Sequence, residues 1–180
     1  MIKRFLVSVA MLFSSAAAAS SHIELDAGIN RIDLNGNGRE DYVVASIFDR
    51  NMSYSHHALT FFIHLPSDEF AIVPATDRDT FTWLDHRVFS GAIIVRDNQL
   101  FESEGEVFLV VARKHLEGAD VFGPGHFTFE VYGLREFSQH PGTPLYQWSR
   151  LKTFESAEPH LSAEQAFEEI DDHVLPGATR

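Results

Sequence analysis

The sequence predicts an all-β fold, a sandwich or a barrel, closed by one short C-terminal helix. Between residues 22 and 154, short apolar segments recur at close spacing and are separated by turn residues, as is typical of antiparallel sheets. No helical periodicity interrupts this stretch. The chain has 180 residues, a length that one hydrophobic core can serve, and it contains no internal repeat or linker. We therefore expect a single domain over residues 20–180, preceded by a leader.

Residues 1–19 predict a secretory signal peptide. Lys3 and Arg4 precede an apolar run from Phe5 to Phe13, and Ala16 to Ala19 are the small residues that a signal peptidase accepts. The run is shorter than the roughly 20 apolar residues that a membrane-spanning helix needs. The leader therefore predicts export to the periplasm without membrane insertion. Its removal takes two basic residues away and changes the net charge from -12 to -14.

Charge and cysteine content exclude several classes of function. The chain has 26 acidic and 14 basic residues, so nucleic acids and anionic membrane surfaces are disfavoured as partners. It has no cysteine, which removes disulfides, thiol catalysis and Cys-ligated zinc or iron–sulfur sites. We therefore expect the exported protein to be stabilised by packing alone, to which its 16 Phe residues contribute large buried areas.

Two hydrophobic patterns predict the strands. Apolar residues alternate with more polar ones over 59–65 and 127–131, which places one face of each strand in a core. The segments 42–48, 92–95 and 107–112 are more continuously apolar, as expected for central strands covered on both sides. Trp83 and Trp148 lie in predicted strands, where we expect core packing in preference to stacking on a ligand ring.

The last element predicted is the helix. Ser162 and Gln165 have the spacing of a capping box, and apolar residues from Ala163 to Val174 recur at helical spacing. We expect this helix to cover part of a sheet.

The segment from Asp33 to Asp41, DLNGNGRED, resembles the first nine positions of a calcium-binding loop. Calcium takes six to eight oxygen ligands at about 2.3–2.6 Å, and alternate side chains of a tight loop can supply them. The twelfth position is Val44 where an EF-hand needs a bidentate Glu, so the loop is not an EF-hand. The predicted ligands are Asp33, Asn35, Asn37, the carbonyl of Arg39, and Asp41. The alternative is a plain Asn-Gly turn, which needs no metal.

The remaining motifs do not indicate an enzyme. His56, His57 and His64 lack the spacings of the common zinc hydrolase motifs, so we expect surface histidines. Ser149 and Lys152 match the S-x-x-K pattern of serine β-lactamases, but the S-D-N and K-T-G motifs that accompany it are absent. We therefore expect no catalytic residue.

Several segments together resemble the carbapenem intrinsic resistance family. They are the loop 33–41 after the first hairpin, the segments 51–57, 59–63 and 70–74, and the segment 142–148 before an acidic terminal helix. The resemblance implies a sandwich of stacked antiparallel sheets, a homodimer, and a cation site on Asp33, Asn35, Asn37, Arg39 and Asp41. It also implies a periplasmic protein that protects carbapenem-producing bacteria by a route other than ordinary β-lactam hydrolysis.

Three functions follow as hypotheses. The first is a non-enzymatic resistance protein that binds a carbapenem or shields the target of the drug. The second is a lysozyme inhibitor, because the family shares its fold with periplasmic inhibitors of invertebrate-type lysozyme. Such inhibitors often present a Ser-Gly-x-x-Tyr loop, whereas here the segment from Ser90 ends in Ile94. The third is a calcium-stabilised module that acts within a larger complex.

Overall fold

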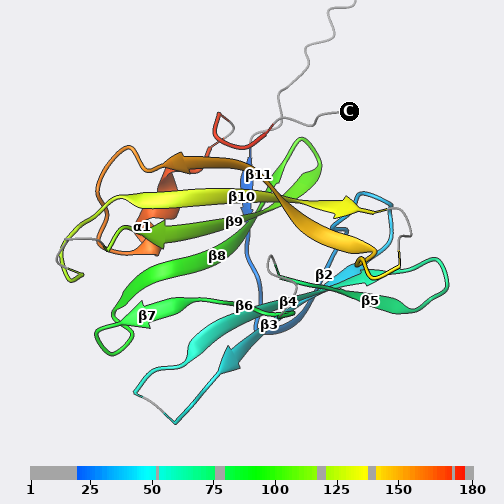
Figure 1. The fold of residues 1–180 in the computed structure, drawn as a ribbon, viewed down its shortest axis with the longest axis horizontal. Coiled ribbons are helices and arrows are strands. Elements are labelled where there is room, and N and C mark those ends of the chain that lie inside the picture. The colour runs from blue at the N-terminus through cyan, green and yellow to red at the C-terminus, as the bar shows by residue number, and fades with distance from the viewer. Residues whose placement is uncertain are drawn as a thin grey trace, which may run out of the picture.

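Two antiparallel sheets and a short C-terminal helical segment make up the fold, which confirms the predicted all-β sandwich (Figure 1). The computed structural model describes residues 20–51, 53–75, 80–116, 121–137, 141–171 and 173–176. The predicted signal peptide lies outside these residues. Among the described residues, no helix has the length and apolar character needed to cross a membrane.

The larger sheet, sheet A, has the strand order β1-β8-β9-β10-β11, and β7 also pairs with β8. Its strands are β1 (Ser21–Ile23), β7 (His86–Val88), β8 (Ile93–Ser103), β9 (Glu106–Lys114), β10 (Phe127–Glu136) and β11 (Tyr146–Glu155). The smaller sheet, sheet B, has the order β2-β3-β4-β5, with β6 paired to β4. Its strands are β2 (Gly28–Ile32), β3 (Asp41–Phe48), β4 (His56–His64), β5 (Phe70–Val73) and β6 (Trp83–Leu84).

The main core lies between the two sheets. Phe61 and Ile63 of β4 are fully buried and meet Leu109 of β9 in one cluster of apolar side chains. Trp83 and Trp148 belong to the same cluster and are each 1% exposed, which confirms that both pack in the core. The alternation predicted for the 59–65 segment therefore marks the face of β4 that is turned toward sheet A.

A second core lies on the other face of sheet A. Phe127 and Phe129 of β10 pack there against Ala163, Ala166 and Phe167 of the C-terminal segment. Because β9 lies between the two cores, both of its faces are buried, as its apolar sequence predicts. The same prediction is wrong for residues 42–48. In β3, only alternate residues are buried at first and its last three are exposed, because no described element covers the outer face of sheet B.

The C-terminal helix is shorter than its sequence pattern suggests. α1 covers only Ala163–Ala166 and continues as one 3₁₀ turn, η1, over Phe167–Glu169. Ile170 has an extended backbone and ends this segment. The Ser162 side chain does not cap the helix, because its hydroxyl accepts a hydrogen bond from the backbone N–H of Ile94 at 3.4 Å. Ser162 thus joins the helix start to sheet A.

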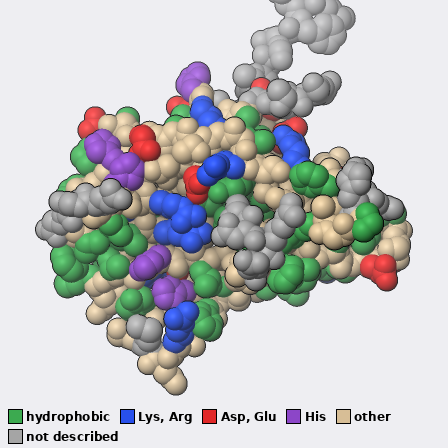
Figure 2. All heavy atoms as spheres, in the orientation of Figure 1, with side chains coloured by type: hydrophobic (Ala, Val, Ile, Leu, Met, Phe, Trp, Pro, Cys, Tyr) green, Lys and Arg blue, Asp and Glu red, His purple; other side chains and the backbone are tan. Residues whose placement is uncertain are grey.

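Figure 2 shows basic side chains near the centre of one face, with acidic ones beside them. Among the ion pairs of the protein, one carboxylate is shared by two arginines. Arg113 and Arg150 both donate to Glu130, at 3.0 and 2.7 Å. Burial acts to raise the pKa of Glu130, but the hydrogen bonds from Arg150 and Arg113 outweigh it and hold the pKa below its ordinary value. These two arginines are therefore engaged within the protein.

Candidate functional site

The predicted cation loop joins β2 to β3 and is closed by its own side chains. Asp33 accepts hydrogen bonds from the backbone N–H groups of Asn37 and Gly38, at 3.1 and 2.7 Å. Asn35 and Asn37 each accept one from the residue two positions further on, at 3.2 and 2.8 Å. Gly38 has a positive φ of 79°, which a residue without a side chain adopts readily. The loop is therefore ordered by bonds between its side chains and its backbone.

The last two predicted ligands face in different directions. The Arg39 guanidinium leaves the loop and donates to Asp68 at 3.0 Å, so Arg39 could reach a cation only through its carbonyl. Asp41 is fully buried, and its two carboxylate oxygens accept backbone N–H bonds from Leu34 and His64, at 2.9 and 2.8 Å. Burial raises the pKa of Asp41, and these two bonds oppose the change.

The donor set of the loop matches part of what calcium requires. It contains two carboxylates, two side-chain amides and a backbone carbonyl, and an oxygen that accepts one N–H bond keeps a further lone pair. After burial, the charge of Asp33 is a further cause of the raised pKa of Asp41, so the two carboxylates influence each other. Among the described residues, no three His, Cys, Asp or Glu side chains form a metal-binding group. A cation here would depend on amide and carbonyl oxygens.

A cavity of about 550 Å³ lies between the sheets and includes none of the loop residues. Its lining residues on β8 coincide with a gap in the edge of sheet A. β7 pairs with β8 as far as Arg96, and β1 pairs with the same strand from Leu100 onward. Between these two positions, residues 97–99 have no strand beside them on that edge in the described chain. Residues 97–99, which this edge leaves unpaired, are thus among those that line the cavity.

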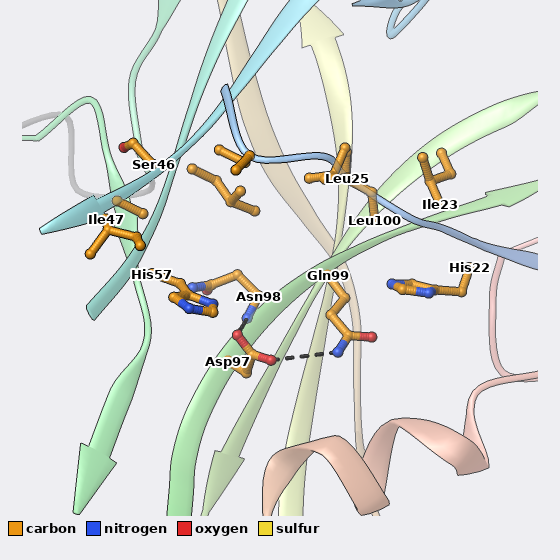
Figure 3. Close-up of a pocket in the computed structure, with 14 residues that line it drawn as sticks. His22, Ile23, Leu25, Ser46, Ile47, His57, Asp97, Asn98, Gln99 and Leu100 are labelled. Carbon is orange, nitrogen blue, oxygen red and sulfur yellow. Dashed lines mark hydrogen bonds between the residues drawn. The ribbon is translucent and has the colours of Figure 1, made fainter. Parts of the chain in front are cut away.

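Segments from both sheets line this cavity. Its residues are His22, Ile23, Leu25 and Ala27 from the β1–β2 region, Ala45 to Ile47 of β3, His57 to Leu59 of β4, and Asp97 to Leu100 of β8. Figure 3 shows His57, Asp97 and Asn98 toward one end, His22 toward the other, and Gln99 between them. We call His57, Asp97 and Asn98 the polar end of the cavity. The remaining wall is mainly aliphatic, as is common in sites for small organic molecules.

Asp97 is the acidic group of the polar end. Burial raises its pKa to about 6, and the nearby charge of Asp85 acts in the same direction, while that of Arg87 opposes it. The carboxylate accepts hydrogen bonds from the backbone N–H of Asn98 at 2.9 Å and from the Gln99 side chain at 3.5 Å. The Asn98 side-chain oxygen is buried without a hydrogen-bond partner among the described residues. The hydrogen-bonding groups at the polar end are thus only partly paired within the described protein.

The buried carboxylate of Asp85 holds the backbone of His57 in place. Asp85 accepts a hydrogen bond from the backbone N–H of His57 at 3.0 Å and binds the Nε of Arg87 at 2.5 Å. The same carboxylate lies 3.2 Å from Nδ1 of His56. Arg87 in turn places its Nη2 atom 3.2 Å from Nδ1 of His57. His56 and His57 therefore begin strand β4 within a polar network and do not lie in the predicted loop, while the His57 side chain is exposed, as predicted for a surface histidine.

Sequence reasoning did not find this pocket. The sequence predicts a surface position for His57, with zinc binding as the alternative, and its motifs include none of Asp85, Asp97 and Asn98. One signal is present in the sequence, because four polar residues, Arg96 to Gln99, separate the apolar segments 93–95 and 100–101 of β8. Such an interruption indicates a change of environment, but it does not identify the strands that lie opposite.

The fold and the pocket define a β-sandwich protein with a cavity sized for a small molecule. A family model described as "Carbapenem resistance protein CarG-like" matches residues 25–169, so the chain belongs to this family. The chain is also similar to a solved structure described as "Crystal structure of CarG". The two are 38% identical with a TM-score of 0.82, over 87% of this chain and 99% of that one. A search of curated protein sequences found no match.

These comparisons confirm the family inferred from the sequence and make this a carbapenem resistance-related protein.

Proposed function

We propose that this protein confers carbapenem resistance by binding the drug in the cavity between the sheets, without hydrolysing it. The observation that carries the proposal is the cavity itself. Its volume of about 550 Å³ lies within the range of about 300–1,000 Å³ typical of small-molecule sites, and its wall is aliphatic with a few polar groups. A carbapenem is a small bicyclic molecule with a carboxylate and a lactam carbonyl, which suits such a wall.

The residues around the cavity support binding in preference to hydrolysis. Ser46 is the only hydroxyl among the lining residues, and within the described chain it has no hydrogen bond to a histidine, lysine or carboxylate that would activate it. The S-x-x-K lysine is engaged elsewhere, because Lys152 donates to the carbonyl of Val174 at 3.0 Å and lies over the Phe154 ring. An activated nucleophile is therefore not assembled from these groups.

Absorbance of the carbapenem ring separates binding from hydrolysis. We expect calorimetric titration to give saturable binding with one drug per chain, and the ring absorbance to persist when drug is in excess over protein. Turnover of excess drug would show that the protein is an enzyme. Unchanged absorbance without any heat of binding would direct the proposal toward shielding of the drug's target.

We also propose that the 33–41 loop holds a structural divalent cation, with calcium as the best match to its oxygen donors. Calcium should raise the melting temperature relative to chelator, and Asp33→Ala should remove that difference. Linkage predicts a stabilisation of about 2.7 kcal/mol when free calcium is a hundredfold above its dissociation constant. Identical melting curves of the wild type with calcium and with chelator would favour the plain turn.

The proposed site of action is the periplasm, with residues 1–19 acting as the signal peptide. Cell fractionation and the mass of the exported protein test this, since cleavage after Ala19 leaves a chain that begins at Ser20.

A homodimer is the proposed assembly, and the outer face of sheet B is the surface offered for it. Its exposed apolar side chains include Ile29 at 68%, Phe48 and Phe70 at 41%, and Ile72 at 39%. An apolar sheet face of this kind is typical of a protein interface. Light scattering should give a dimer mass, and Ile72→Lys should reduce it to that of a monomer. A monomeric wild type would contradict the proposal.

Lysozyme inhibition remains a second candidate because of the turn between β7 and β8. Phe89, Ser90 and Gly91 have consecutive positive φ angles, which non-glycine residues adopt only at a cost, and Phe89 is 67% exposed. An aromatic side chain held out on such a turn is suited to a protein partner. Assays against invertebrate, chicken and goose lysozymes test it, with Phe89→Ala as the variant expected to lose inhibition.

A further inference from the structure

The contact with Arg87 determines which ring nitrogen of neutral His57 carries the hydrogen atom. A guanidinium group only donates hydrogen bonds, so the Nδ1 atom of His57, 3.2 Å from Nη2 of Arg87, must be the acceptor. The ring hydrogen of neutral His57 therefore lies on Nε2. Within the described chain, Nε2 has no hydrogen-bond partner, and His57 lines the cavity. An occupant of the cavity is thus offered an N–H donor from sheet B.

Sheet A presents an acid at the same end of the cavity. Figure 3 shows the Asp97 carboxyl group on β8 near the His57 ring, with Asn98 beside both. The charged groups that act on Asp97 are Asp85 and Arg87. The nearest strand partner in β9 is Ala112, which is uncharged. The other titratable groups nearby are His22 on the cavity wall and His86, which lies opposite Arg96 of β8.

A carboxylate ligand at the polar end would meet both features. The His57 N–H would stabilise its charge, while an ionised Asp97 would repel it. Asp97 is half-buried, and the His57 side chain is exposed to solvent. Two carboxylates brought side by side repel each other, and this repulsion raises the pKa of the pair, which favours a state in which one of them is protonated. A proton shared at this position removes the repulsion and supplies a hydrogen bond.

We propose that a carbapenem binds with its carboxylate between His57 and Asp97, and that Asp97 takes up one proton as the drug binds. The inference rests on the proposed binding of the drug in the cavity, and it specifies the orientation of the bound drug. The bicyclic body then lies along the aliphatic wall, against Leu25, Leu59 and Leu100.

Calorimetry of a carbapenem and of its neutral methyl ester tests the proposal. Both are titrated into the full chain between pH 6 and pH 8, in buffers of different ionisation enthalpy. Because burial raises the pKa of Asp97 to about 6, affinity for the acid should fall about tenfold per pH unit above that value. The heat should report uptake of up to one proton. Affinity for the ester should change little with pH.

Variants assign the effect to the two residues. Asp97→Asn should make binding of the acid independent of pH and about a hundredfold tighter than the wild type at pH 8, where only about one Asp97 in a hundred is protonated. Glu102→Gln is the matched control, since it removes one charge from an exposed position on the same strand. His57→Phe should weaken binding of the acid but not binding of the ester. His57→Gln, which keeps an N–H donor, should restore part of the lost affinity for the acid.

The outcomes separate the inference about the Asp97 proton from the proposed function, which is drug binding. Binding of the acid without proton uptake, or an Asp97→Asn variant with the pH profile of the wild type, would overturn the inference and leave drug binding intact. Failure of both acid and ester to bind the wild type would overturn the proposed function itself.

Discussion

The cation loop and the cavity both contain a buried or half-buried aspartate, yet they are built in opposite ways. Asp41 of the loop has a backbone N–H bonded to each carboxylate oxygen, from Leu34 and His64. Asp97 of the cavity has one backbone N–H bond and one side-chain contact, and it lies beside an unpartnered Asn98 oxygen. The protein holds the first carboxylate with two short backbone bonds from different elements, whereas the second lies at the wall of an open cavity.

This difference separates stability from function. The loop closes on itself within nine residues and fixes the start of β3, so changes there should affect folding. The cavity depends on strands from both sheets and contains groups that the protein does not satisfy, so replacing a group there should alter binding and should not destabilise the fold. The following variants test this division, from the largest expected effect on stability to the smallest.

Asp41→Ala should have the largest effect on stability. It removes both acceptors of two backbone N–H groups in a fully buried position, and each unsatisfied donor costs about 1–3 kcal/mol. We expect a loss of about 4 kcal/mol in the free energy of unfolding, measured by urea denaturation. Glu40→Ala is the control, because its ion pair with Arg31 is exposed to solvent and should contribute little to stability. Similar losses in the two variants would show that Asp41 is not the anchor of the loop.

Asp97 should make stability depend on pH. A carboxyl group whose pKa is raised to about 6 in the folded state binds more protons there than in the unfolded chain, between about pH 4 and pH 6. Stability should therefore fall as the pH rises through this window and level off above it, by about 3 kcal/mol in total. Asp97→Asn should remove this part of the profile and be more stable than the wild type at pH 7.5. Parallel profiles for wild type and variant would contradict the assignment.

Asp33→Ala should have a smaller effect in the presence of chelator. The bonds it loses, from the N–H groups of Asn37 and Gly38, are exposed to water, which can replace them. We expect a loss of about 1 kcal/mol in the free energy of unfolding without calcium. A loss as large as that of Asp41→Ala would show that the loop is held mainly by Asp33.

Ala27→Trp should leave stability within about 0.5 kcal/mol of the wild type and abolish drug binding. Ala27 lines the cavity but is itself exposed, so an indole there can occupy the opening without disturbing the core. Thermal unfolding and calorimetric titration measure the two effects. Drug binding that persists unchanged would place the site elsewhere on the protein.

The sequence predicts those features that depend on neighbours along the chain. Alternation at 59–65 and 127–131 identifies β4 and β10, because each strand has one face in a core. The turn at 33–41 is visible because its side chains bond to their own backbone. The capping pattern at Ser162 locates the start of α1 but not its length, since the Ser162 hydroxyl bonds to β8 and the chain becomes extended at Ile170.

The cavity could not be predicted in this way. It depends on β1 and β7 adding to the same edge of β8 and leaving residues 97–99 between them, and on the placement of β3 and β4 opposite. His57 and Asp97 are 40 residues apart in the chain and lie in different sheets. The sequence shows that polar residues lie in an apolar stretch of the chain. It does not show which residues of the other sheet lie opposite them, because that depends on how the two sheets pack.

The most direct test of the central claim is to follow backbone amide resonances while a carbapenem is added to the full exported protein. We predict saturable shifts at Ala45, His57, Asp97 and Leu100, which line the cavity, and none in the loop from Asp33 to Asp41. Shifts confined to that loop or to the turn at Phe89, or a spectrum that does not change, would contradict the account.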